Sequence, residues 1–389
     1  MSGKRRRVCV VITARASYAR IKTVLEAVRD HPDLELLLVV AASALLERYG
    51  SVINIIRADG FEPTSTVYML VEGENLVTSA KSTGAGIVEL ATVFDNLAPD
   101  MVLSIADRYE TIATAIAASY LNIPVVHIQG GEVTGSIDEK VRHAVTKLSN
   151  LHMVSNKHAA QRVLQMGEDP ASVHVTGCPS IDLAARVMAE DDGDFDVYEV
   201  IGGAGVGHPI NVDNGYLVVM QHPVTSEHEA AAAQVEKTLH AIHHMEIPTF
   251  WFWPNVDAGS DSSSAAIRHY REAHDPAHIY FLKNLSPENF LRLLRRSRCI
   301  IGNSSVGIRE CSFMGVPTVN IGSRQNRRER AANVIDVDYD KTAIVAAIES
   351  HMENGPFPQS DLYGDGVAGT RIVVLLASVE LGFDKQITY

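Results

Sequence analysis

The feature that most restricts the fold of this chain is a regular alternation of short apolar strands with helices, densest between residues 101 and 147. The apolar run 101–104 predicts a buried strand, and residues 109–121 carry apolar side chains at helical spacing. Pro124 then restarts extended structure, and residues 125–129 predict the next strand. Because strands that alternate with helices in this way build a doubly wound parallel sheet, we expect an α/β fold.

The same alternation recurs along the chain in two series. In the first, strands are expected at 7–13, 34–42, 65–68 and 174–176, with an amphipathic helix over 45–57. In the second, strands are expected at 216–221, 249–253, 279–282, 298–301 and 318–321. Since 389 residues exceed what one hydrophobic core organises, we expect two Rossmann-like domains with a cleft between them. Their expected bounds are 1–185 for the N-terminal domain, 186–215 for a junction, 216–367 for the C-terminal domain, and 368–389 for a helix that packs back on the N-terminal domain.

Composition excludes several classes of protein. The net charge of −13 argues against binding to nucleic acid or to an anionic membrane surface. No apolar segment is long enough to span a bilayer or to form a signal-peptide core. The four cysteines lie far apart without metal-ligand spacing, so we expect a reduced, cytoplasmic protein. No metal is expected, because the histidines at 240, 243 and 244 lack a carboxylate at metal-binding spacing and fit a solvated helix face better.

A group of polar residues is expected at the carboxyl ends of the strands between residues 101 and 147. Any one of them has an ordinary interpretation as a loop residue or a helix cap. Several charged groups at one edge of an apolar sheet instead indicate a ligand site, because such charges need partners. The members of this group are Asp107, Arg108, His127, Gln129, Glu132 and Asp138.

Two other loops invite a nucleotide-binding interpretation and do not support it. The first strand-to-helix turn, residues 13–17, lacks the glycine triplet of a dinucleotide-binding turn, so no NAD or FAD is expected, and no other organic cofactor. Residues 202–207 are rich in glycine but lack the lysine of a P-loop, and Pro209 follows where a helix would be required. An exposed segment at the domain junction is the better interpretation.

A second candidate site lies in the C-terminal series, at the turn Asn303-Ser304-Ser305. It is expected where a strand gives way to a helix, an arrangement that suits a phosphate. The ordinary interpretation is a serine N-cap. The carboxylate of Glu310 is suited to the vicinal hydroxyls of a ribose, and Arg324 is suited to phosphates. A diphosphate joined to a sugar is the simplest ligand that fits serines, arginines and carboxylates together.

With these residues in view, the sequence resembles the UDP-N-acetylglucosamine 2-epimerase family over nearly its whole length. Within the family it is similar to the hydrolysing branch of sialic-acid and legionaminic-acid pathways. The resemblance implies a GT-B-like architecture, with the nucleotide held by the C-terminal domain and the sugar facing the N-terminal domain. The segments that carry it are Asp107-Arg108-Tyr109-Glu110, residues 127–139, Arg142-His143-Ala144, His222-Pro223-Val224-Thr225, residues 254–260 and Gly302-Asn303-Ser304-Ser305.

The resemblance also implies a mechanism and a role for each candidate residue. A base removes the proton at sugar C2 as UDP leaves C1, and water then adds to the resulting glycal. Asp107 and Asp138 match the family's catalytic carboxylates, and His222 would sit beside the phosphate and assist the leaving group. The remaining roles implied are diphosphate binding for Arg15, Ser304, Ser305 and Arg324, ribose binding for Glu310, contacts to neighbouring groups for Asn255 and Arg108, and support for His127, Arg142 and His143.

The sequence departs from the family pattern near the sugar. Gln129 stands where this branch normally has a glutamate, and a carboxamide cannot act as a proton acceptor. Either Glu132 or a water takes over that role, or the chemistry is altered. Ser17, Ala44 and the pair Ile105-Ala106 also replace usual residues. We infer a related nucleotide sugar, substituted differently at C4 or C6, or a variant reaction.

The expected function is therefore release of UDP and the 2-epimeric free sugar, of N-acetylmannosamine type, from UDP-N-acetylglucosamine or a related UDP-2-acetamido sugar. The alternatives are a non-hydrolysing epimerase, a GT-B glycosyltransferase on a related nucleotide sugar, and a nucleotide-sugar-binding protein without turnover. The expected assembly is a homodimer or homotetramer.

Overall fold

The computed structural model describes residues 4–47, 50–73, 75–105, 108–134, 137–191, 195–254 and 259–388. The chain forms two compact units. Unit 1 comprises Met1–Glu132, Ile137–Leu183 and Tyr363–Tyr389, and unit 2 comprises Val133–Ser136 and Ala184–Leu362. The segment 186–215, expected as a junction, is thus counted with unit 2, and the C-terminal helix with unit 1.

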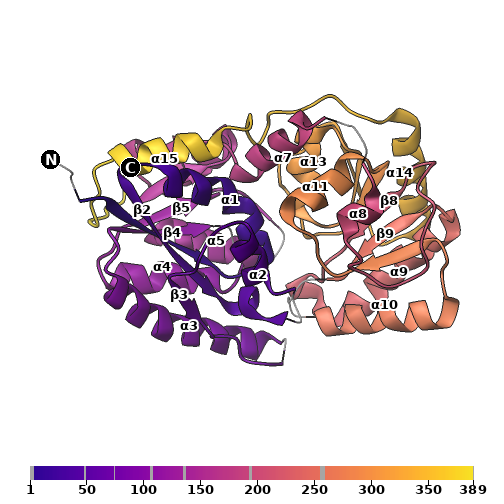
Figure 1. The fold of residues 1–389 in the computed structure, drawn as a ribbon, viewed down its shortest axis with the longest axis horizontal. Coiled ribbons are helices and arrows are strands. Elements are labelled where there is room, and N and C mark those ends of the chain that lie inside the picture. The colour runs from indigo at the N-terminus through magenta and orange to yellow at the C-terminus, as the bar shows by residue number, and fades with distance from the viewer. Residues whose placement is uncertain are drawn as a thin grey trace. The chain divides into compact units, whose positions relative to one another are not determined.

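Unit 1 is built on a seven-stranded parallel sheet of order β3-β2-β1-β4-β5-β6-β7 (Figure 1). The order reverses between β1 and β4, which pair in parallel. This reversal is the topological switch point, where open α/β sheets bind ligands. The strands are β1 (Arg6–Ile12), β2 (Leu34–Ala41), β3 (Ser65–Val67), β4 (Met101–Ile105), β5 (Val125–Ile128), β6 (Leu151–Val154) and β7 (Val173–Val175).

Helices cover both faces of this sheet because its strands are apolar on both sides. Val8, Val10 and Ile12 of β1 point into one core, shared with α1 (Arg15–Asp30) and α15 (Ala368–Ser378), while Cys9 and Val11 point into the other. Figure 1 shows α15 beside α1, with α3 (Leu76–Leu97) and α4 (Thr111–Tyr120) on the opposite face. The other α-helices described here are α2 (Val52–Ala58), α5 (Ile137–Leu148), α6 (Lys157–Gln165) and α7 (Pro179–Ala189), which carries the chain from unit 1 into unit 2.

The prediction of one helix over 45–57 is wrong in its first half. Residues Ala42–Leu45 form a 3-10 turn, and the α-helix begins only at Val52. Ala42, Gly50 and Ser51 all have positive φ, a left-handed conformation that interrupts a helix. Helix α1 begins at Arg15, after an Ala14 cap that provides no side-chain hydrogen bond.

Unit 2 repeats the design with a six-stranded parallel sheet of order β10-β9-β8-β11-β12-β13 and a switch point between β8 and β11. Its strands are β8 (Leu217–Met220), β9 (Thr249–Phe252), β10 (Ile279–Leu282), β11 (Cys299–Gly302), β12 (Thr318–Ile321) and β13 (Val334–Val337). Its helices are α8 (Val197–Ile201), α9 (Ala231–Met245), α10 (Ser260–His274), α11 (Pro287–Arg295), α12 (Ser305–Ile308), α13 (Glu310–Met314) and α14 (Lys341–Asn354). Both sheets are parallel and doubly wound, so the expected Rossmann-like fold of each half is confirmed.

The glycine-rich run 202–207 has a structural role in unit 2. Val206 exchanges two backbone hydrogen bonds of 2.9 Å with Phe281 on the edge strand β10. A Cβ at Gly205 would lie 2.3 Å from Tyr280 and one at Gly207 3.0 Å from the Ile279 carbonyl, so only glycine lets the run approach this closely. The run protects a sheet edge.

The C-terminal segment is anchored to unit 1 at two places. The buried Asp182 carboxylate accepts the N–H groups of Ala368 (2.8 Å) and Gly369 (2.6 Å) at the start of α15. Beyond the helix, the Lys385 ammonium donates to the Thr146 carbonyl (3.0 Å) and lies 2.5 Å from a carboxylate oxygen of Glu168.

Candidate functional site

Two arginines follow the strands that border the switch point of unit 1. Arg15 is the first residue of α1, directly after β1, and Arg108 follows β4. Loss of hydration lowers the pKa of Arg15 to about 10, so its guanidinium remains charged at neutral pH. Arg108 is buried, and its Nε donates to Glu110 Oε1 at 2.8 Å. Asp107, the expected carboxylate of this loop, lies outside the described residues.

Glu110 is the last residue of the motif Asp107-Arg108-Tyr109-Glu110, and its place in the site could not be predicted from the sequence. Its side chain is almost completely buried, and its second oxygen, Oε2, has no hydrogen-bond partner among the residues that the structure describes. A buried carboxylate oxygen without a partner is unusual, because leaving it unsatisfied is costly. Together, Arg108 and Glu110 place a cation and a carboxylate at the end of β4.

The loop after β5 begins with Gln129 in a strained conformation. Its φ is +68°, rare for a residue other than glycine or asparagine, and its backbone N–H continues the sheet by donating to the Met153 carbonyl (2.9 Å). The side chain is buried, with Nε2 2.7 Å from Cys178 Sγ, and that sulfur lies 3.0 Å from Ser180 Oγ. The Gln129 side chain therefore contacts a thiol that is itself within hydrogen-bond distance of a hydroxyl.

Glu132, three residues further, is engaged within unit 1. Its Oε1 accepts from Ser155 Oγ at 2.9 Å, and its backbone carbonyl accepts from Arg142 at 2.7 Å. All three residues are buried. These contacts join the loops after β5 and β6 to helix α5.

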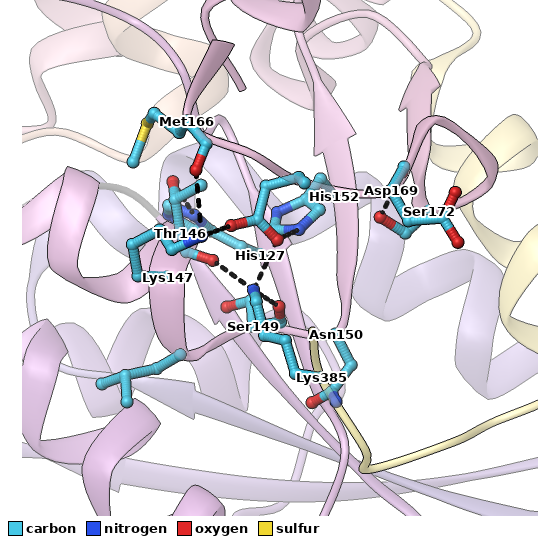
Figure 2. Close-up of polar contacts among 12 residues, drawn as sticks. His127, Thr146, Lys147, Ser149, Asn150, His152, Met166, Asp169, Ser172 and Lys385 are labelled. Carbon is cyan, nitrogen blue, oxygen red and sulfur yellow. Dashed lines mark hydrogen bonds and ion pairs between the residues drawn. The ribbon is translucent and has the colours of Figure 1, made fainter. Parts of the chain in front are cut away.

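The remaining candidates of unit 1 differ in their access to solvent. His127 lies inside the sheet on β5, with Nδ1 3.2 Å from Thr146 Oγ1 (Figure 2), so its position is that of a core residue. Asp138 is partly exposed in the first turn of α5. His143, one turn on, has Nε2 3.5 Å from Glu139; burial and the neighbouring Arg142 nevertheless lower its pKa, so it is neutral at physiological pH.

At the switch point of unit 2, one asparagine connects the ends of two strands. His222 follows β8, and its N–H donates to Asn303 Oδ1 at 2.7 Å, while Asn303 Nδ2 donates to the His222 carbonyl at 2.8 Å. Gly302 allows this close approach, because a Cβ there would lie 2.2 Å from the Met220 carbonyl. His222 and the serines after Asn303 are therefore held at adjacent strand ends.

The serine turn differs in one respect from the expected phosphate site. Ser304 caps a helix of only four residues, α12, so the helix dipole contributes little there, and Ser304 Oγ accepts weakly from the Val306 N–H (3.4 Å). Ser305 Oγ accepts from the buried Arg309 at 2.8 Å. The turn thus depends on arginine and hydroxyl groups more than on a helix terminus.

Two charged groups lie close to this turn in sequence or by contact. Arg324, after β12, has NH1 3.4 Å from the Asn303 carbonyl, and Gln325 donates to the same oxygen at 2.9 Å. Glu310, at the start of α13, is buried, and its Oε2 finds no hydrogen-bond partner in the described part of the chain. Asn255, the other expected binding residue, lies outside the described residues.

In the ranges that the structure describes, neither a metal-binding cluster nor a membrane-spanning helix is found. Over the ranges that the structure describes, no three or more His, Cys, Asp or Glu side chains are arranged to hold a metal ion. Within the same ranges, no helix combines the length and the apolar character needed to cross a bilayer.

The fold and the two switch points define a protein of the GT-B class, with a Rossmann-like sheet in each half. The sequence model of the family UDP-N-acetylglucosamine 2-epimerase matches residues 26–377, and the chain belongs to this family.

Known relatives agree in sequence and in fold. The chain is 32% identical to the UDP-N,N'-diacetylbacillosamine 2-epimerase (hydrolyzing) of Legionella pneumophila over 97% of each chain. It is 26% identical to the GDP/UDP-N,N'-diacetylbacillosamine 2-epimerase (hydrolyzing) of Campylobacter jejuni, over 85% of this chain and 84% of that one. The crystal structure of UDP-GlcNAc 2-epimerase from Neisseria meningitidis bound to UDP-GlcNAc superposes with a TM-score of 0.80 at 18% identity, covering 95% of this chain and 99% of that one.

Proposed function

We propose that this chain is a hydrolysing 2-epimerase that releases UDP from a UDP-2-acetamido sugar and gives the 2-epimeric free sugar. The observation that carries the proposal is the placement of motif residues from distant parts of the sequence at the switch point of each sheet. Arg15 and Arg108 occupy one, and His222 with Ser304 and Ser305 occupies the other.

The names of the relatives support two finer points of the proposal. The Legionella and Campylobacter proteins are both described as hydrolysing, and both act on a diacetamido sugar nucleotide. We therefore propose the same outcome here, with a sugar that carries a second acetamido group as the first substrate to test and UDP-N-acetylglucosamine as the second.

The proposed reaction has two steps. In the first, a carboxylate removes the proton at C2, the C1–oxygen bond breaks with its electron pair going to UDP, and a C1–C2 double bond forms. In the second, water adds its oxygen to C1 and gives up one proton to a carboxylate, while a proton is delivered to C2 from the opposite face. Asp107 and Asp138 are the proposed proton-transfer residues, and His222, Arg15, Ser304, Ser305 and Arg324 would stabilise the departing diphosphate.

Glu310 and Gln129 have distinct places in this proposal. The buried Oε2 of Glu310, which has no hydrogen-bond partner among the residues that the structure describes, is suited to accept from the hydroxyls of a ribose. Gln129, beside Cys178, cannot accept a proton and would act as a hydrogen-bonding residue. The buried, engaged carboxylate of Glu132 supports a structural contribution to the loop, leaving Asp138 as the more accessible base.

Turnover in deuterated water tests the proposal. With either UDP sugar, the expected result is UDP release and a free 2-epimer with deuterium at C2. A 2-epimeric UDP sugar with no free sugar would indicate a non-hydrolysing epimerase. UDP release without deuterium would indicate transfer or plain hydrolysis, and binding without release would leave a binding protein; each of these three results contradicts the proposal.

Gln129→Glu tests whether the carboxamide is the altered element of the site. If a carboxylate at this position is used in proton transfer, the variant should release UDP faster than the natural chain. Gln161→Glu, the same change on the exposed face of α6, is the matched control and should leave the rate unchanged. An unchanged rate and product in Gln129→Glu would show that position 129 takes no part in proton transfer.

A further inference from the structure

Asn303 is completely buried at the point where the sheet of unit 2 reverses its strand order. Its carboxamide makes two hydrogen bonds to a single residue, accepting from the His222 N–H at 2.7 Å and donating to the His222 carbonyl at 2.8 Å. Because one bond needs an acceptor and the other a donor, only one orientation of the amide satisfies both. The side chain thus acts as one further rung of the β8–β11 ladder beyond the strand ends.

The backbone of Asn303 extends the connection to a third strand. Its N–H donates to the Met220 carbonyl at the end of β8 (3.2 Å), and its carbonyl accepts from Gln325 (2.9 Å) in the loop after β12. The loops after β8, β11 and β12 are therefore tied to one buried residue. These loops carry His222, the serine pair and Arg324, respectively.

We infer that Asn303 is a positioning residue, which holds His222 in register with the serine turn that would bind the leaving diphosphate. The inference rests on the proposed function for its ligand, but the two hydrogen bonds between Asn303 and His222 lie within unit 2 alone. Preorganised donors accelerate a reaction only if they are held where charge develops. The hydrogen bonds from Asn303 to both backbone groups of His222 provide this constraint. Without the Asn303 side chain, the His222 backbone loses the two hydrogen bonds that hold it beside the residue preceding Ser304.

The test compares Asn303→Ala, and the milder Asn303→Ser, with the isosteric control Tyr216→Phe. Tyr216 is also buried in unit 2 and directly precedes β8, at the opposite end of this strand from His222. Its hydroxyl donates to the Leu293 carbonyl at 2.7 Å. The control therefore removes one buried hydrogen bond from the same unit and keeps the two hydrogen bonds between Asn303 and His222. Thermal unfolding of each variant identifies any general loss of fold.

We expect the Asn303 variants to lower kcat by roughly ten- to a hundredfold with a smaller change in KM, because the lost constraint acts in the transition state. Tyr216→Phe should keep kcat within about twofold. The decisive measurement is the pair Asn303→Ala and His222→Ala: if Asn303 acts through His222, the double variant should be no slower than His222→Ala alone. Multiplicative losses, or a kcat loss matched by Tyr216→Phe, would overturn the inference.

The affinity for UDP, measured by calorimetry, separates this inference from the proposed function. If the natural chain binds UDP but turns over no UDP sugar, the proposed function fails, and the same double-variant comparison is made on the dissociation constant. A non-additive loss of affinity would then support the positioning role. Equal UDP affinity of the natural chain and Asn303→Ala in that case, or no UDP binding at all, would refute it.

Discussion

Replacing Glu168 with glutamine should destabilise unit 1 far more than the same change at a surface ion pair. Lys147, His152 and Lys385, labelled in Figure 2, all contact one carboxylate, that of Glu168. Lys147 Nζ lies 2.7 Å from one oxygen, and His152 Nε2 and Lys385 Nζ lie 3.0 and 2.5 Å from the other. Burial alone would raise the pKa of this carboxyl, but hydrogen bonds from His152, Lys147 and Lys385 outweigh it and lower the pKa to about 2.

The size of the effect follows from that pKa. A fall from an ordinary value of 4.5 to about 2 corresponds to roughly 3 kcal/mol of stabilisation at neutral pH. The Lys147 and Lys385 side chains keep 36% and 23% of their surface exposed, so solvent screens part of the attraction. We therefore expect Glu168→Gln to cost about 2 kcal/mol. Asp365→Asn, which neutralises the exposed partner of Arg371 in the same unit, should cost less than about 1 kcal/mol.

Hydrogen exchange is the suitable assay because both tryptophans of the chain, Trp251 and Trp253, lie in unit 2 and their fluorescence does not report on unit 1. The free energy of opening for amides of β6 should fall in Glu168→Gln and hardly change in Asp365→Asn. Since the folded pKa is the lower one, the stabilisation is present above pH 4.5 and is lost as the pH falls toward 2, with about half remaining at pH 3. Equal losses in the two variants, or a difference that persists undiminished at pH 3, would refute this account.

Two further predictions concern other buried groups of the chain. Asp182→Asn should weaken the attachment of α15 by about 1.5–3 kcal/mol, because the two oxygens of Asp182 accept from Ala368 and Gly369 and an amide has only one oxygen. Faster hydrogen exchange confined to α15 and the helices beside it would show this loss. Burial raises the pKa of the Cys9 thiol to about 12 and raises that of Cys299 still further. Neither thiol should therefore be alkylated by iodoacetamide at pH 8 in the folded chain. Alkylation at the rate seen in the urea-unfolded chain, measured by mass spectrometry, would contradict this prediction.

Much of the fold could be predicted from apolar periodicity, and the exceptions have physical causes. The strands β6 and β13 were not predicted, because His152 interrupts the apolar run of β6 and Asp336 interrupts that of β13. The helix over 45–57 was predicted in error, because Ser51 adopts a left-handed conformation that its residue type does not signal. The C-terminal helix, expected over 368–389, ends already at Ser378, and its first N–H groups are capped by Asp182, which is distant in sequence.

In the candidate site, too, the positions of the loops could be predicted from residue types, whereas the contacts between side chains could not. The sequence identified the loops that carry Arg15, Arg108, His222 and the serine pair, because strand ends can be predicted from pattern. It did not assign a role to Asn303 or Glu110, although both stand inside motifs that it quoted. Their importance lies in contacts across strand ends, with His222 in one case and Arg108 in the other, and such contacts are not visible in a sequence.

The buried carboxylates separate into two groups once their partners are known, and this separation bears on function. Glu168 has nitrogen donors at both oxygens, and Asp182 accepts through both of its oxygens, so each serves the fold. Glu110 and Glu310 are buried as deeply, yet each has an oxygen with no partner among the described residues. Each follows a strand that borders a switch point, β4 in unit 1 and β11 in unit 2. Because a buried oxygen left unsatisfied is costly, its persistence at these two positions is explained most simply by a ligand that supplies the missing donors.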